Sequence, residues 1–172
     1  MRLENRVSVD ILEAITFLDK QVTDPSAGLP EALFLFASRI TPMVNVDLLL
    51  QDDRGRTLLS WRNDRYAGTG WHLPGGIVRF QETMKTRLDK VVASEIGTPV
   101  MFDAKPLKIS EMIASHKKSR GHFISFLFKG YLSGDFIPPN KGLRRTEAGY
   151  LQWHESCPGD LLEVQKIYKR YF

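Results

Sequence analysis

The chain has 172 residues, of which 42% are hydrophobic and 26% are charged, a balance typical of a single soluble globular domain. Its net charge of +4 suits an anionic small-molecule ligand and is far below the charge density of a dedicated nucleic-acid binder. The chain has one cysteine, so an internal disulfide bond is excluded and a reducing, cytoplasmic compartment is expected. No apolar stretch approaches the roughly 20 residues that a membrane-spanning helix needs, so we expect no membrane partner.

The first predicted element is an amphipathic helix over residues 8–21. Ser8 is a suitable N-cap, and apolar residues recur at helical spacing along one face. The turn-rich stretch 23–28 separates this helix from the rest of the chain. We therefore divide the chain into an N-terminal helical extension, residues 1–29, and a main domain, residues 30–172. The apolar face of the extension needs a partner, either the domain itself or a second copy in a homodimer.

The main domain mixes strands and helices without strict alternation. Helices are expected at residues 30–39, 81–96 and 160–170. Strands are expected at residues 43–51, 57–63, 105–113, 122–132 and 149–154, with a further short strand within 64–79. The first two of these strands are joined by a short turn and form a hairpin. This order predicts an α+β fold with a mixed sheet covered by helices.

A glycine turn and two glutamates accompany the helix predicted at 81–96. Glu82 lies in the expected first turn, where a negative charge complements the helix dipole. Glu95 follows Val91 by four residues and Val92 by three, so it lies beside the apolar stripe and points inward. An inward carboxylate needs a partner, and a hard divalent cation is a natural one. The alternative is a helix with one capping and one surface glutamate.

This segment resembles the Nudix box, G-x5-E-x7-R-E-U-x-E-E-x-G-U, in which U is a bulky apolar residue. The residues that match in register are Gly76, Glu82, Val92, Glu95 and Gly97, and the preceding WHLPGG is similar to the approach used in that superfamily. Lys90, Val91 and Ser94 stand where the box has its arginine and two of its glutamates. The resemblance implies the Nudix α/β/α sandwich and a magnesium-dependent hydrolase that retains fewer metal ligands than usual.

Outside the box, residues 30–172 resemble the GDP-mannose mannosyl hydrolases. TPMVNVD at 41–47 resembles T-P-L-V-S-L-D of that branch, and DDRGRTLLSWRNDR at 52–65 resembles its arm N-S-R-G-E-F-L-L-G-K-R-T-N-R. Those hydrolases also lack a full set of box glutamates and work with one magnesium ion. The resemblance implies hydrolysis of a nucleoside diphosphate sugar, GDP-mannose-like, to the nucleoside diphosphate and the sugar.

The same resemblance assigns candidate site residues. The Gly75 carbonyl and Glu95 would be ligands of Mg²⁺, and Asp47 and Arg62 would be catalytic residues in the substrate site. Arg62 would face the diphosphate or the leaving group. The candidates for substrate binding are Arg62, Arg65 and Arg79.

A late loop carries a further candidate, Glu147. When the loop is anchored on Trp153, Glu147 falls where the family has a metal-binding glutamine, and Ala148 falls where it has the catalytic histidine. Glu147 is therefore a candidate both as a metal ligand and as a catalytic residue. The alternative is an exposed loop glutamate paired with Arg144 or Arg145.

The sequence leaves two other functions open. One is ordinary Nudix pyrophosphatase chemistry on another nucleoside diphosphate derivative, which would yield a nucleoside monophosphate. The other is a catalytically silent nucleotide-binding module, because several substitutions remove reactive groups. These substitutions are Ile77, Val91, Ser94 and Ala148.

Two further features are interpreted as structural. The basic cluster Lys117, Lys118 and Arg120 could reach a phosphate, but we interpret it as a solvated loop. His72 follows Trp71 in the strand that approaches the box, and we interpret it as a packing residue. Neither feature is included in the predicted site.

Overall fold

The computed structural model of the chain describes residues 9–172, and the N-cap predicted at Ser8 lies outside this range. The helices are α1 (Val9–Gln21), α2 (Glu31–Ile40), α3 (Met84–Val91), the π-helix η1 (Val92–Ile96) and the 3₁₀-helix η2 (Glu163–Tyr171). The strands are β1 (Met43–Gln51), β2 (Thr57–Asp64), β3 (Gly68–His72), β4 (Gly75–Ile77), β5 (Met101–Phe102), β6 (Lys108–Ile113), β7 (His122–Tyr131) and β8 (Leu151–His154).

Strand β1 lies at the centre of one mixed sheet. Its residues from Val46 to Leu50 are buried, as expected for a strand that is covered on both faces. β1 pairs antiparallel with β2 and β4 and parallel with β7. The predicted hairpin and the mixed character of the sheet are therefore confirmed.

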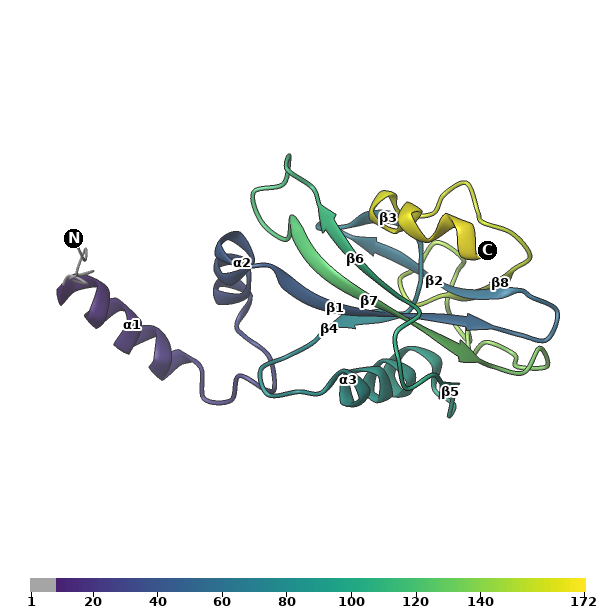
Figure 1. Cartoon of the computed structure of the whole chain (residues 1–172), viewed down its shortest axis with the longest axis horizontal. Helices are drawn as coiled ribbons and strands as arrows, with labels where there is room; N and C mark the ends of the chain where they lie inside the picture. Colours follow the sequence, from purple (N-terminus) through teal and green to yellow (C-terminus); the bar gives the residue numbers. More distant parts are fainter. Residues whose placement is uncertain (1–8) are drawn as a thin grey trace.

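Helical elements cover the two faces of this sheet (Figure 1). On one face, α3 and η1 pack on a cluster that comprises Val46, Leu48, Leu50, Leu58, Leu88, Val92, Ile96, Phe128, Leu132 and Leu151. On the other face, η2 and the segment before it cover a cluster that comprises Leu49, Leu59, Trp61, Trp71, Leu73, Leu127, Leu161 and Tyr168. The alternation of side chains along β1 supplies both clusters. The predicted α+β class and α/β/α sandwich are confirmed.

The helix predicted at 81–96 differs at both ends. Gln81 has a φ of 56°, which interrupts the helix, and α3 begins only after Thr83, whose side chain accepts a hydrogen bond from the Thr86 backbone N–H. The prediction that Glu82 lies in the first helical turn is therefore wrong. At the other end the helix widens into η1, and the backbone N–H of Gly97, at φ 75°, closes it on the Val92 carbonyl.

Other boundaries also shift. The stretch 64–79 contains two strands, β3 and β4, where one was expected. The closing helix is a 3₁₀-helix, and the short strand β5 was not predicted. Each difference concerns a short element whose pairing or winding is decided by tertiary contacts rather than by periodicity.

The N-terminal helix α1 extends away from the sheet, and α2 lies beside one end of β1 (Figure 1). The side chains of Leu12, Ile15 and Phe17 on α1 remain about half exposed. Among the described residues, no helix combines the length and the apolar character needed to cross a membrane.

Candidate active site

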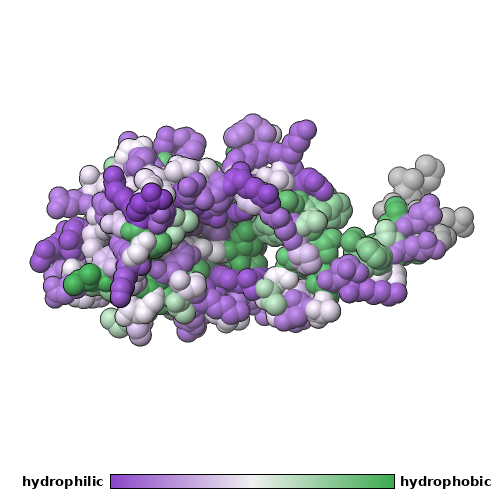
Figure 2. Space-filling view, turned by 180° about the vertical axis from the view of Figure 1, so that it is seen from behind, coloured by the Kyte–Doolittle hydropathy of each residue, from purple (hydrophilic) through white to green (hydrophobic). Residues whose placement is uncertain are grey.

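A cleft of about 1370 Å³ lies at the end of the sheet where β4 meets β1. Its walls also come from the α1–α2 linker, the β2–β3 turn, the β6–β7 loop and η2. Hydrophobic residues are concentrated at the surface where the projecting N-terminal helix α1 joins the rest of the molecule (Figure 2). Linker residues that line the cleft are Val22, Pro25, Gly28 and Leu29. The segment predicted as an extension, residues 1–29, therefore contributes part of the cleft wall.

Asp47 lies buried on β1 at the cleft, held by three side chains. Its Oδ2 accepts hydrogen bonds from Ser125 Oγ at 2.6 Å and from Tyr168 Oη at 2.8 Å. Its Oδ1 accepts a bond from Gln165 Nε2 at 3.2 Å. Burial raises the pKa of Asp47, and the hydrogen bonds from Ser125 and Tyr168 oppose that rise. The carboxyl group is therefore fixed in one orientation.

Gly75 lies between Asp47 and Glu95, and there is no space for a side chain at this position. A Cβ at this position would lie 2.6 Å from Asp47 Oδ1 and 2.6 Å from the carbonyl oxygen of Val46. The backbone N–H of Gly75 faces Glu95 Oε1 at 3.4 Å. The β4 backbone at Gly75 therefore contacts both Asp47, on one side, and Glu95, on the other.

Glu95 projects from η1 and makes no ion pair with any described residue. Burial raises its pKa to about 7; the Gly75 N–H and the charge of Arg62 oppose this rise, and the charge of Asp47 adds to it. In α3 and η1, which together form the box helix, the two positions where the motif has further glutamates carry no carboxylate. Val91 is buried in the core, and the Ser94 hydroxyl donates to the Lys90 carbonyl at 2.8 Å.

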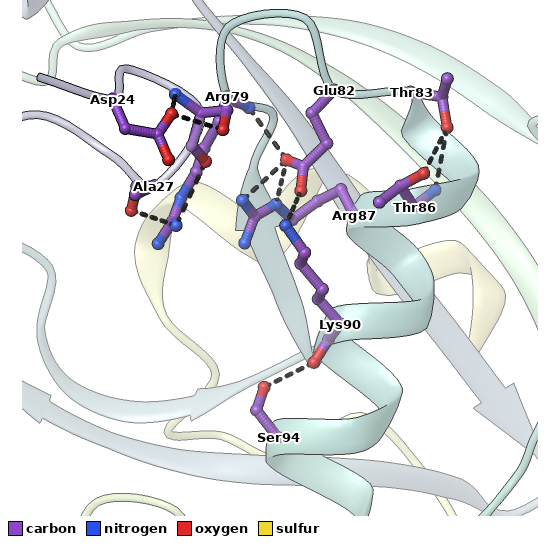
Figure 3. A network of polar contacts seen from close by, with 10 residues as sticks. Asp24, Ala27, Arg79, Glu82, Thr83, Thr86, Arg87, Lys90 and Ser94 are labelled. Carbon is purple, nitrogen blue, oxygen red and sulfur yellow. Dashed lines mark hydrogen bonds and ion pairs between the residues drawn. The ribbon is translucent and has the colours of Figure 1, made fainter.

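Glu82, in contrast, is neutralised by its own chain (Figure 3). Its carboxylate lies 2.7 Å from Arg87 Nη2 and 2.9 Å from Lys90 Nζ, and it accepts a bond from the Arg79 backbone N–H at 3.0 Å. Burial alone would raise its pKa, but the Lys90, Arg79 and Arg87 contacts lower the pKa to about 2. Glu82 therefore fixes the turn that precedes α3.

Arg62 on β2 lines the cleft and pairs with Asp64 two residues further along. Its charge lowers the pKa values of both Asp47 and Glu95. The structure thus brings together four of the predicted site residues. These are Asp47, Arg62, Gly75 and Glu95.

The two other predicted arginines have structural partners. Arg79 lines the cleft, but its guanidinium donates to the carbonyl oxygen of Ala27 in the α1–α2 linker. Arg65 pairs with Glu31 on α2, stacks over Tyr66 at 4.9 Å and does not line the cleft.

Glu147 does not join the cleft residues. Its carboxylate accepts hydrogen bonds from Arg144 Nε at 2.7 Å and from the Arg144 backbone N–H at 3.0 Å, and these contacts lower the pKa of Glu147. This geometry matches the alternative of a loop glutamate paired with an arginine. Its role in metal binding or catalysis stays a prediction.

Sequence reasoning did not find the partners of Asp47. Gln165 and Tyr168 lie three residues apart on η2, in line with the apolar residues Leu161 and Leu162. A glutamine at core spacing in an amphipathic segment was the available signal. Gln165 Oε1 also accepts from the Leu73 backbone N–H at 2.6 Å, which joins η2 to the segment before β4.

Comparisons with known proteins address the fold. No model of a known protein family matches the chain. Over 148 residues the chain is 29% identical to the low-salt glycan biosynthesis protein Agl8 of Haloferax volcanii, which covers 76% of this chain and 94% of that protein. In structure it is similar to a MutT Nudix hydrolase from Burkholderia pseudomallei, with a TM-score of 0.59 and 20% identity over 76% of this chain and 98% of the other.

A second structural neighbour comes from Jonesia denitrificans and is described as a possible asymmetric diadenosine tetraphosphate hydrolase. Its TM-score is 0.57 at 19% identity, and the match covers 77% of this chain and 92% of the other. The chain has the Nudix fold. Within this fold, the cleft is lined by Asp47 and Gly75, and Glu95 reaches the backbone N–H of Gly75 from η1.

Proposed function

We propose that the chain is a magnesium-dependent hydrolase that converts a GDP-mannose-like nucleoside diphosphate sugar to the nucleoside diphosphate and the sugar. The observation that carries this proposal is the carboxylate of Glu95, which lies behind the cleft residue Gly75 and has no cationic partner among the described residues. A half-buried carboxylate with a raised pKa is a frequent feature of functional sites.

The residues present fit one magnesium ion and do not fit a cluster of ions. Within residues 9–172, no group of three or more His, Cys, Asp or Glu side chains is arranged to hold a metal. Magnesium in nucleotide enzymes is commonly held by one or two carboxylates, with substrate phosphates and water completing its shell. Glu95 and the Gly75 carbonyl would hold it. The bound ion would neutralise negative charge on the departing diphosphate.

The protein groups around this position have distinct roles in the proposed reaction. Arg62 places a guanidinium in the cleft, where it neutralises phosphate oxygens and orients the leaving group. Asp47 is a positioning residue, because its oxygens are already engaged by Ser125, Tyr168 and Gln165. It aligns β1 against Gly75, so the metal-binding backbone stays in place.

The relative in glycan biosynthesis supports a sugar-bearing substrate, whereas the Jonesia neighbour's description supports cleavage between phosphates. Turnover of a nucleotide-sugar panel in oxygen-18 water separates these reactions. Label in the released sugar, dependent on magnesium, is the expected result. Label in a phosphate would replace the proposal by pyrophosphatase chemistry, and tight nucleotide binding without turnover would replace it by a binding module.

A further inference from the structure

Five cationic side chains line the cleft, and they differ in whether they have a hydrogen-bonding partner within the protein. Four of them already have a hydrogen-bonding partner in the protein. These pairs are Arg62 with Asp64, Arg79 with Ala27 O, Arg87 with Glu82, and Lys117 with Tyr66 O. The fifth, Arg120, makes no side-chain hydrogen bond or ion pair with any residue in the described range.

Arg120 is nevertheless held firmly in the β6–β7 loop. Its guanidinium carbon lies 4.8 Å from the ring centre of Tyr66 and 5.5 Å from that of Phe34. Its backbone has a φ of 53°, and its N–H donates to the Oγ of buried Ser38 at 3.0 Å. The loop therefore presents the side chain in one orientation, against the interpretation of a solvated basic loop.

Both rings lie within cation–π distance of the guanidinium, and its N–H donors make no hydrogen bond to any described residue. A guanidinium carries five such donors in a fork that matches a phosphate or a carboxylate. Burial and the charge of Arg62 lower the pKa of Arg120, whereas the charge of Asp64 opposes this shift. Neither Glu111 nor Asp64 forms an ion pair with Arg120, since Glu111 pairs with His122 and Asp64 pairs with Arg62.

We propose that Arg120 is an oxyanion-binding residue that holds a phosphate or a carboxylate group of the bound nucleotide sugar, with Phe34 and Tyr66 fixing its guanidinium. This proposal rests on the proposed function for the identity of the ligand. Lys117, whose Nζ is held on the Tyr66 carbonyl at 3.0 Å, adds a second positive charge to the same wall. The subsite extends substrate recognition beyond the predicted residues Arg62, Arg65 and Arg79.

Calorimetric titration without magnesium, in the presence of EDTA, tests the proposal separately from turnover. The probes are pyrophosphate, guanosine, GDP, GDP-mannose and GDP-mannuronate, and the variant is Arg120→Gln. Loss of hydrogen bonds to a charged group should weaken binding about 10- to 100-fold. Weaker binding of pyrophosphate and GDP assigns a phosphate to Arg120. Weaker binding of GDP-mannuronate alone assigns a carboxylate.

Arg39→Gln is a matched control, since Arg39 stacks on Phe36 at 5.7 Å but does not line the cleft. Both substitutions remove an arginine that stacks on an aromatic ring. Only Arg120→Gln should reduce the affinity for the probes and the rise in unfolding temperature that bound ligand produces. Arg120→Lys should restore binding only in part, because lysine keeps the charge without the fork. Unchanged affinity for all four anionic probes, no anion binding by the wild type, or an equal loss for guanosine would overturn the proposal. None of these results depends on whether the protein hydrolyses its ligand.

Discussion

Glu82 and Glu95 lie near opposite ends of the box helix and have opposite electrostatic environments. Two cations and a backbone N–H lower the pKa of Glu82 to about 2, whereas burial raises the pKa of Glu95 to about 7. Both glutamates occupy motif positions, but Glu82 is paired with Arg87 and Lys90, whereas Glu95 has no ion pair with any described residue. A glutamate at a motif position is therefore a candidate functional group only when its carboxylate has no cationic partner within the protein.

The largest expected effect comes from removing the charge of Glu95. Glu95→Gln should reduce magnesium-dependent kcat/KM by a factor on the order of 100–1000, the range found when one transition-state contact is lost. The thermal unfolding midpoint without metal should not fall, because the variant removes an unpaired half-buried carboxylate. Steady-state kinetics over a magnesium series measures the effect. Near-native activity at the same magnesium concentration would contradict the assignment.

The second-largest effect is expected at Gly75, whose backbone lies between the carboxyl groups of Asp47 and Glu95. In Gly75→Ala, the new Cβ would meet Asp47 Oδ1 and the Val46 carbonyl, each at 2.6 Å. Overpacking of this kind costs about 1–3 kcal/mol, and the shift of β4 should also lower activity. Gly159→Ala is the control, since a Cβ there meets no atom within 4 Å. Urea unfolding should separate the two variants, and equal stability of both would refute the steric argument.

Glu82→Gln should affect stability rather than chemistry. The folded pKa of about 2 lies below the ordinary 4.5, so the paired carboxylate stabilises the fold above about pH 5, and this stabilisation is lost as the pH falls toward 2. After allowance for solvent screening, we expect a loss of about 1–2 kcal/mol at neutral pH. Urea unfolding of both proteins at several pH values should show the difference shrinking on acidification. A difference that grows at low pH would exclude this pairing as its cause.

Much of the fold could be predicted because its signals are local. The apolar run around β1 and the helical spacing of Leu88, Val92 and Ile96 identify the centre of the sheet and the face of the helix. The start of α3 could not be located from periodicity, because Thr83 and the left-handed backbone of Gln81 decide it. Winding of the last turn as a π-helix has no sequence signal of comparable strength.

The candidate site could be predicted only where the motif applies. The register of the box located Gly75 and Glu95, and the first-strand resemblance located Asp47. Ser125 and Tyr168, which hold Asp47, are 78 and 121 residues away in the chain, and their contacts depend on the pairing of β7 with β1 and on the docking of η2. Arg120 could not be singled out within its basic loop, because charge runs are usually solvated and its stacking arises from residues of two other segments.

The smallest effect is expected at Glu147, which extends the comparison to a third glutamate. Its carboxylate lies outside the cleft and is paired with Arg144 near the surface, so it resembles Glu82 in being satisfied and differs from Glu95. Glu147→Gln should lower kcat/KM by less than about tenfold, since an amide oxygen can still accept from Arg144 or coordinate a metal. Kinetics over a magnesium series, run beside Glu95→Gln, gives the ordering. A larger loss at Glu147 than at Glu95, unrelieved by added magnesium, would make Glu147 the general base and require the loop to move into the cleft during turnover.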